Sequence, residues 1–248
     1  MVTRFAVFGD VHGHQNVMYD KAREWMEKFG ESLDAILQVG DFETIMRPEH
    51  FEHYYAPAKY HHISDLREYA EGVRNPCALT VFTGGNHEAW SVLAENKNGG
   101  FVCPRIYYLG LAGTLDINGI TIAGLTGIFS RKWYNAVRGD HPSYDWKYYR
   151  REDVEKLRDV SADILLLHEW PQPVDDSFRV LREQNVPAPV RAGTPTPAYQ
   201  LVKGMQPRFV FAGHLHKASM HARINGTRFV GLRQVMQPDG FMHVLEIT

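Results

Sequence analysis

Five clusters of histidine, aspartate and asparagine residues are the part of this 248-residue sequence with the clearest capacity for chemistry. Two of the clusters contain pairs at i, i+2 spacing, which places both side chains on the same face of an extended chain. The donors are oxygen and imidazole with no thiolate, a set that suits zinc, manganese or iron. The clusters are Asp10-Val11-His12, Gly40-Asp41, Gly85-Asn86-His87-Glu88, His168 and Gly213-His214-Leu215-His216.

The number of candidate ligands predicts two metal ions. A lone Gly-Asp after a strand usually marks an ordinary turn, and a lone histidine there usually makes one hydrogen bond, but five such clusters together favour a metal centre. Two ions about 3.5–4 Å apart activate a water and clamp a phosphoryl group during in-line displacement. Seven side chains are too many for one tetrahedral ion and suit two ions that share a carboxylate: Asp10, His12, Asp41, Asn86, His168, His214 and His216.

A short apolar run precedes each cluster, and we interpret each run as a buried β-strand. Helical spacing of apolar residues between the runs then predicts an α/β layered fold. Ligands bind beyond the carboxyl ends of strands in such folds, so the clusters should converge. Two Asn-Gly pairs, at 118–119 and 225–226, predict tight hairpins and therefore a mixed sheet. The strands are expected at 5–8, 35–39, 78–82, 164–167 and 209–212, and the helices at 17–29, 63–73 and 154–160.

Composition narrows the classes of protein that remain. The chain is 44% hydrophobic and 23% charged, and it is long enough to bury a core without disulfides. A net charge of −2 gives no global field for nucleic acid or anionic membrane, so such a partner must meet a local patch. Two cysteines exclude a disulfide framework and favour reduced thiols as small buried hydrophobes. No run is long enough for a signal peptide or a membrane span. We expect one cytoplasmic domain covering residues 1–248.

The clusters, taken in order, resemble those of the calcineurin-like metallophosphoesterase family. That resemblance implies a four-layer α/β/β/α sandwich with mixed sheets. It implies one metal held by Asp10, His12, Asp41 and His216, and a second held by Asp41, Asn86, His168 and His214. Asp41 would bridge the two metals. His87 would be catalytic, contacting the phosphate or protonating the leaving oxygen.

Within that family, several runs are similar to RNA lariat debranching enzymes. They include Gly84–Ala89, Ile106–Gly113, Gly127–Phe129 and His168–Pro171. Those enzymes carry cysteine at the position of Asp10, and a carboxylate here strengthens the case for two metals. They usually carry aspartate at the position of Glu169. The eukaryotic enzymes also have a long C-terminal extension that this sequence lacks, which argues against lariat RNA itself as the substrate.

Two further segments are candidates for substrate contact. Residues 131–151 interleave six basic with six aromatic side chains, a mixture that favours single-stranded nucleic acid. From this segment, which takes the place of the substrate-recognition loop in the resemblance, we select Arg131, Trp133 and Tyr134 as substrate-binding residues. The alternative is that its rings pack on the domain and its charges face water. Residues 50–62, rich in histidine and tyrosine, are more simply a partly exposed helix and loop, although they could overhang the site. Residues 187–197 are expected to form a surface loop.

The leading hypothesis is a phosphodiesterase or nuclease that uses two divalent ions (Mn, Fe or Zn). Hydroxide generated by the metals would attack a nucleic-acid or nucleotide phosphodiester, with RNA or single-stranded nucleic acid as the candidate substrate. No membrane or protein partner is implied. A phosphomonoesterase or nucleotide phosphatase is the alternative. Related phosphatases usually have arginines after the second aspartate and before the Asn-His pair, where this chain has Phe42 and Gly85. A non-catalytic scaffold is disfavoured because the ligand set is complete.

Overall fold

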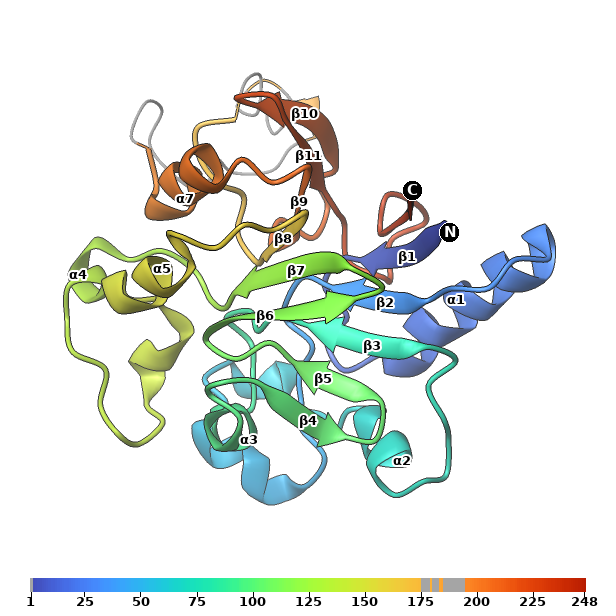
Figure 1. The fold of residues 1–248 in the computed structure, drawn as a ribbon. Helices are drawn as coiled ribbons and strands as arrows, with labels where there is room; N and C mark the ends of the chain where they lie inside the picture. The colour runs from blue at the N-terminus through green and yellow to red at the C-terminus, as the bar shows by residue number, and fades with distance from the viewer. Residues whose placement is uncertain (1, 175–178, 180–182, 185–194) are drawn as a thin grey trace.

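Two six-stranded sheets pack face to face, with helices on their outer sides, in the computed structural model of the chain (Figure 1). The structure describes residues 2–174, 179, 183–184 and 195–248. The predicted four-layer α/β/β/α sandwich with mixed sheets is therefore confirmed. Among the described residues, none of the helices has the length and apolar character needed to cross a membrane.

The first sheet carries the N-terminal half of the metal-ligand clusters. Strands β1, β2, β3 and β5 run parallel in its centre, and β12 and β4 pair antiparallel at its two edges. The strand order is β12 (Met242–Ile247), β1 (Thr3–Phe8), β2 (Ala35–Gln38), β3 (Leu79–Phe82), β5 (Ile106–Tyr108) and β4 (Gly100–Cys103).

The second sheet has the same plan, with four parallel strands between antiparallel edges. Both edges are hairpins that turn at the predicted Asn-Gly pairs, where each residue has a positive φ as a type I′ turn requires. The order is β10 (Met220–Ile224), β11 (Thr227–Gly231), β9 (Phe209–Ala212), β8 (Ile164–Leu167), β7 (Ile120–Leu125) and β6 (Ala112–Ile117).

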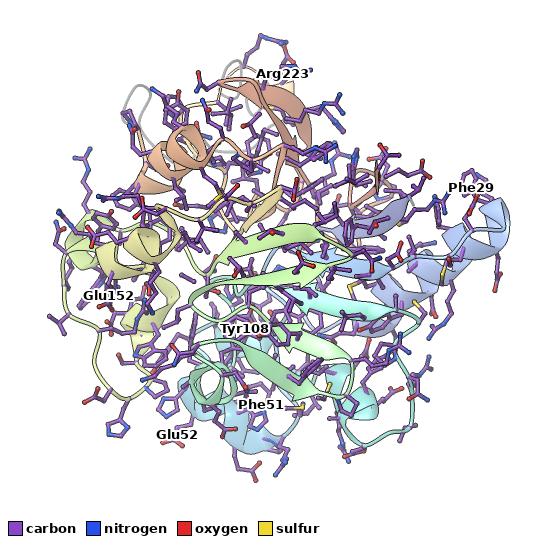
Figure 2. The ribbon with its side chains drawn as sticks, viewed as in Figure 1. Phe29, Phe51, Glu52, Tyr108, Glu152 and Arg223 are labelled. Atoms are coloured by element: carbon purple, nitrogen blue, oxygen red, sulfur yellow. The ribbon has the colours of Figure 1, made fainter. Side chains whose placement is uncertain are left out.

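Alternation along the buried strands explains how the layers adhere. Phe5 and Val7 of β1 join Ile164 and Leu166 of β8 in the core between the sheets. The intervening residues of β1, such as Phe8, instead pack toward the outer side. Strands covered on both faces are apolar throughout for this reason. Figure 2 shows the side chains on this ribbon, with the buried Tyr108 in the middle of the molecule and the exposed Phe29 at the end of α1.

The helices and 3-10 turns connect these strands. Helix α1 covers the first sheet through Met18 and Ala22, and α7 covers the second through Leu201 and Val202. The helices are α1 (Gln15–Phe29), α2 (Leu66–Ala70), α3 (Trp90–Glu95), α4 (Arg131–Tyr134), α5 (Arg151–Leu157) and α7 (Pro197–Met205). The 3-10 turns are η1 (Pro48–His53), η2 (Ala58–Tyr60) and η3 (Tyr144–Lys147).

All five predicted strands are present, with ends displaced by two residues or fewer. The helix predicted over 63–73 is shorter, because Ile63 packs in the loop beside Ile45 and the chain turns left-handed at Gly72. Cys103 is buried as expected, but Cys77 is only partly so. The predicted surface loop at 187–197 lies mostly outside the described residues, and α7 begins at Pro197.

Candidate metal centre

The predicted ligands converge where the carboxyl ends of five parallel strands meet. In the first sheet, Asp10 and His12 follow β1, Asp41 follows β2 and Asn86 follows β3. In the second sheet, His168 follows β8, and His214 and His216 follow β9. Both sheets contribute, so the seven candidate ligands come from opposite layers of the sandwich. The convergence expected from the strand ends is therefore what the fold produces.

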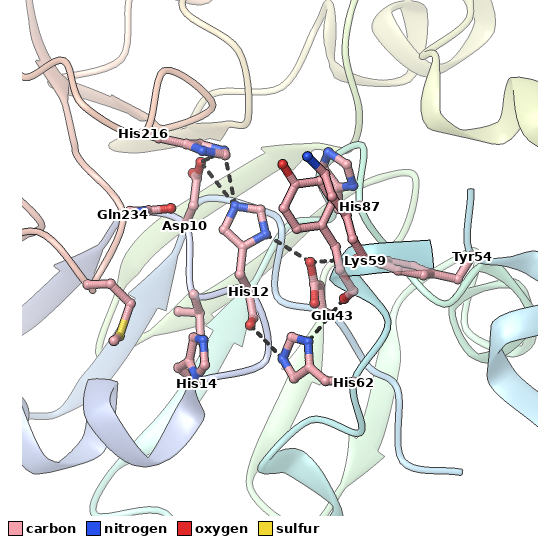
Figure 3. A pocket seen from close by; sticks show the side chains of 13 residues that line it. Asp10, His12, His14, Glu43, Tyr54, Lys59, His62, His87, His216 and Gln234 are labelled. Carbon is pink, nitrogen blue, oxygen red and sulfur yellow. Dashed lines mark hydrogen bonds and ion pairs between the residues drawn. The ribbon is translucent and has the colours of Figure 1, made fainter. Parts of the chain in front are cut away.

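The first group consists of Asp10, His12, Asp41 and His216, whose ligand atoms all lie within 4.8 Å of one another. The Nε2 atoms of His12 and His216 face each other at 3.0 Å. His216 Nε2 lies 3.2 Å from Asp10 Oδ2 (Figure 3). His12 Nε2 lies 3.6 Å from Asp41 Oδ2. Two carboxylates and two imidazoles thus point at one small volume.

The second group lies deeper and shares Asp41. His168 Nε2 is 3.0 Å from Asn86 Oδ1 and 3.3 Å from Asp41 Oδ1. The His214 ring lies beside that of His168, with centroids 4.9 Å apart. His214 Nδ1 is buried and has no hydrogen-bond partner within the described part of the chain. Asn86, His168 and His214 therefore join Asp41 as a second set of donors.

These donors fit two divalent cations. Asp41 directs one carboxylate oxygen to each group, and its Oδ2 accepts no hydrogen bond from any described residue. Paired imidazole Nε2 atoms and unpartnered buried acceptors are costly unless a cation satisfies them. Oxygen and imidazole donors without thiolate suit zinc, manganese or iron. The residues present would hold two ions with Asp41 between them.

Positive φ angles at four of the ligand residues orient their side chains toward the centre. His12, Asp41, His214 and His216 have φ values of 46°, 52°, 67° and 33°, a region that non-glycine residues seldom occupy. Such conformations persist where surrounding structure enforces them, and they gather at functional sites. Gly213 lets the chain pass close to the site, since a Cβ there would lie 2.0 Å from Asp10 Oδ1.

Three carboxylate or carbonyl groups outside the ligand set hold the ligands in place. Glu43 Oε1 is 2.8 Å from His12 Nδ1, so the Nε2 atom is left to face the centre. His168 is oriented in the same way by the carbonyl oxygen of Val39, 3.0 Å from its Nδ1. The buried Glu88 carboxylate accepts hydrogen bonds from the backbone N–H groups of Phe42, Glu43 and Gly85. Glu88 therefore ties the loop after β2 to the loop after β3.

The electrostatics of the site favour a bound cation. Burial would raise the pKa of Asp41, but the neighbouring His168 and His87 outweigh burial and hold that pKa well below its usual range. Burial opposes a charged His12, yet its hydrogen bond to Glu43 and the nearby carboxylates raise its pKa to about 10, so the metal-free ring holds a proton that a bound cation would displace. Burial, and next His168, lower the pKa of His214 to about 3, so that its imidazole is neutral. Negative potential near the carboxylates and a neutral imidazole are conditions for metal binding.

The first group opens into a cavity of about 510 Å³. His87 lines this cavity, with its ring centroid 5.7 Å from that of His12. The backbone N–H of His87 donates to Asp41 Oδ1 at 2.7 Å, which anchors the residue beside the bridging carboxylate. The His87 side chain therefore faces the cavity from beside the ligand set, as a group that contacts substrate would.

Residues 50–62 form much of the cavity wall. Tyr54, Lys59, Tyr60 and His62 line it, together with His14. The 3-10 turns η1 and η2 match the predicted partly exposed helix and loop, and the segment does overhang the site. Its simpler interpretation as mere surface is therefore incomplete.

Residues 131–151 are placed differently. Arg150 and Arg138 are almost fully buried and pair with Asp145 and Asp153, so two of the six basic side chains serve the fold. Tyr134 packs edge-on against Phe129 and Tyr149.

The three selected substrate-binding residues are absent from the lining of the metal-site cavity. Arg131 is exposed, and Trp133 is half-buried with Lys132 Nζ 4.4 Å from its ring centroid. Their role in binding stays a prediction.

Three acidic residues have roles that the sequence does not reveal. In the sequence, Glu43 appears only in the Phe42-Glu43-Thr44 stretch that stands where related phosphatases have an arginine. Its i, i+2 spacing from Asp41 is no signal, because the chain there is left-handed and not extended. Glu88 follows a site histidine directly and could be expected to orient it, but it instead binds backbone N–H groups. Glu169, which also adjoins a site histidine, accepts a hydrogen bond from the Tyr149 hydroxyl at 2.8 Å.

Known proteins resemble this chain in sequence and in fold. The lariat debranching enzyme of Drosophila melanogaster is 36% identical over 230 residues, covering 86% of this chain and 42% of that enzyme. The Danio rerio enzyme is 30% identical over 270 residues, covering 99% and 47%. The chain thus spans less than half the length of these relatives.

Solved structures share the fold at low sequence identity. The protein TT1561 of Thermus thermophilus superposes with a TM-score of 0.58 at 15% identity, covering 100% of this chain and 99% of that one. A dimetal phosphatase from Danio rerio gives 0.58 at 12% identity, covering 98% and 91%. The calcineurin-like phosphoesterase profile matches residues 3–218, which hold every candidate ligand. On this match the chain belongs to the calcineurin-like phosphoesterase family.

Proposed function

We propose that the protein is a two-metal phosphodiesterase that hydrolyses RNA or another single-stranded nucleic acid. The observation that carries this proposal is the complete ligand set, in which Asp41 directs one oxygen to each group. The lariat debranching enzymes among its relatives support a branched or single-stranded RNA substrate. The proposal extends to two ions drawn from Mn, Fe and Zn, since the donors contain no thiolate.

Each part of the site has a task in this reaction. Divalent ions at such a centre polarise the phosphoryl group and stabilise charge on the attacking and leaving oxygens. Asp10, Asp41, Asn86 and the four ligand histidines would hold the ions, and Glu43 keeps the His12 ring oriented. His87 faces the same cavity and donates a proton to the leaving oxygen, as general acids do.

The phosphomonoesterase alternative is less well supported by the cavity. A monoester ends in a dianionic phosphate, which related phosphatases hold with arginines. Among the described residues that line the cavity there is no arginine, and Lys59 is the single permanent cation. A diester carries less charge at the scissile phosphate and suits such a wall better.

A hydrolysis panel tests the proposal directly. Protein loaded with Mn, Fe or Zn is offered bis-p-nitrophenyl phosphate, p-nitrophenyl phosphate, and branched, linear and cyclic nucleotides. We expect the diesters to be cleaved faster than the monoester, and branched or linear RNA to be cleaved faster than cyclic nucleotides. A preference for the monoester in every metal form would overturn the proposal.

Substitutions in residues 131–151 provide a second test of whether the substrate is a nucleic acid. Trp133→Ala and Arg131→Ala should weaken oligonucleotide binding more than they slow hydrolysis of a small diester. A stacked ring contributes about 1–3 kcal/mol per base when a base is present. The effect of the arginine should shrink as salt rises, because it acts through phosphates. Equal losses on both substrates would mean that the segment only supports the fold.

A further inference from the structure

The cavity beside the metal centre extends well beyond the ligands. One side is formed by Asp10, His12, His87 and His216. Gln234 and Met236 line the cavity on the same side, next to the loops that carry His216 and Asp10. The η1–η2 segment and His14 form another wall, and Figure 3 shows His14 and His62 below His12, with Tyr54 and Lys59 to its right. A volume of about 510 Å³ lies within the range of small-molecule sites. There is room for more than a single phosphate.

Lys59 is the one permanently charged cation among the residues described in that lining. Its side chain is exposed, and it is in none of the ion pairs found among the described residues. The ammonium instead lies 4.7 Å from the ring centroid of Tyr60. A cation that faces a phosphate-binding centre and lacks an acidic partner is available to an anionic ligand.

Tyr60 and two histidines give the same wall flat surfaces. The Tyr60 side chain is 53% exposed although it lines the cavity. The rings of His14 and His62 are stacked, with centroids 5.4 Å apart and planes 19° from parallel. Exposed aromatic faces beside a cation are the elements with which proteins hold single-stranded nucleotides.

The wall is fastened to the metal-ligand loop. His62 Nε2 lies 3.1 Å from the carbonyl oxygen of His12, and His62 Nδ1 lies 3.1 Å from that of Tyr60. Both partners are acceptors, so the neutral ring donates to one of them and the imidazolium donates to both. In either form the imidazole lies between the turn that carries Lys59 and Tyr60 and the turn that carries a ligand. This link holds the cation and the ring at a set position relative to the centre.

We propose that Lys59 and Tyr60 form a nucleotide subsite beside the scissile bond, in which Lys59 binds a second, uncleaved phosphate and Tyr60 stacks on a base. This inference rests on the proposed function, because it adds a substrate preference to that site. The preferred substrate then carries a phosphate one nucleotide away from the bond that is cleaved. A dinucleotide without a terminal phosphate, or a small aromatic diester, offers no partner to Lys59.

The kinetic test compares dinucleotides with and without an added terminal phosphate, at the 5′ or the 3′ end. The wild type should favour one phosphorylated form in kcat/KM. Lys59→Ala should reduce that preference about tenfold, as loss of a hydrogen bond to a charged group does, and Lys59→Arg should restore most of it. Lys28→Ala is the matched control, since Lys28 also lies over the ring that follows it but far along α1. Its preference should equal that of the wild type.

A binding test needs no turnover. A nucleoside 3′,5′-bisphosphate and the corresponding monophosphate are titrated into wild type, Lys59→Ala, Tyr60→Ala and Tyr60→Phe. Lys59→Ala should remove the advantage of the bisphosphate, and Tyr60→Ala should weaken both ligands while Tyr60→Phe retains them. Equal weakening of both ligands by Lys59→Ala, or none, would overturn the subsite. If the wild type cleaves no phosphodiester, the proposed function fails, and these titrations still decide the subsite.

Discussion

The two halves of the metal centre differ in their exposure and in what supports them. In the half that opens to the cavity, the side chains of His12 and His216 are 19% and 40% exposed. In the half behind it, His168 is fully buried. The open half relies on a side chain, Glu43, to orient its histidine, and the buried half relies on the backbone carbonyl of Val39.

Because of this difference, only the open half can be altered by changing one supporting side chain. A backbone carbonyl cannot be removed by substitution, and it is held by the sheet itself. A carboxylate partner makes the imidazole a stronger ligand and can be changed singly. The open half is therefore the one whose metal affinity a single substitution can change and that substrate can reach. Asp41 supplies an oxygen to each half, so its loss should weaken both.

Asp41→Asn should have the largest effect, because it weakens both halves. The amide removes one negative charge and leaves a single oxygen where two are used. We expect turnover to fall to background and metal content to fall below two ions per chain, measured by elemental analysis. Two bound metals with near-normal activity would contradict the role of Asp41 as a ligand shared by both halves.

His87→Ala should come next, with activity lost and both halves intact. Loss of a general acid typically lowers kcat by about 10²–10⁴-fold. Metal content should not change, because His87 contacts Asp41 through its backbone N–H, which alanine keeps. His87→Gln should behave in the same way. Loss of metal in either variant would mean that His87 is itself a metal ligand and that the ligand set assigned to the two halves is wrong.

Glu43→Gln should separate the two halves. The neutral amide weakens the support of His12, and the loss of such a partner typically costs about 10–100-fold in metal affinity or activity. Titration of metal into the stripped protein should show one weakened and one unchanged binding step. Weakening of both steps to the same extent would show that the halves are not independent.

Tyr54→Phe should produce the smallest change in this series. The Tyr54 hydroxyl donates to Glu43 Oε1 at 2.8 Å, so it acts on His12 only through that carboxylate. The free energy of unfolding should fall by about 0.5–1.5 kcal/mol, the usual net value of one hydrogen bond. Metal affinity in the open half should fall less than in Glu43→Gln. A larger loss than in that variant would place Tyr54, rather than Glu43, as the main support.

The amino-acid sequence alone was enough to predict the five strands that precede the clusters and both Asn-Gly hairpins, and to nominate seven candidate ligands, but not the edge strands β12 and β4 or the strand β5. These features are local: a buried strand is a short apolar run, and a ligand cluster follows directly at its end. Because parallel strands of one sheet end at the same edge, local order was enough to predict that Asp10, Asp41 and Asn86 of the first sheet meet. That His168 and His214 come from a second sheet packed on the first follows from the family resemblance and the fold, not from local order.

The polar residues that contact the ligands or line the cavity could be identified only from the tertiary structure. Glu43 reaches His12 because the chain turns left-handed at Asp41 and at Glu43, a conformation that no residue type in this stretch announces. The basic residues of 131–151 looked available for nucleic acid, yet Arg150 is buried against Asp145. Lys59, in a segment that looked like plain surface, faces the cavity. Charge and residue type can be read along the chain, but the partner of a charge is chosen by packing between distant segments, which sequence spacing does not encode.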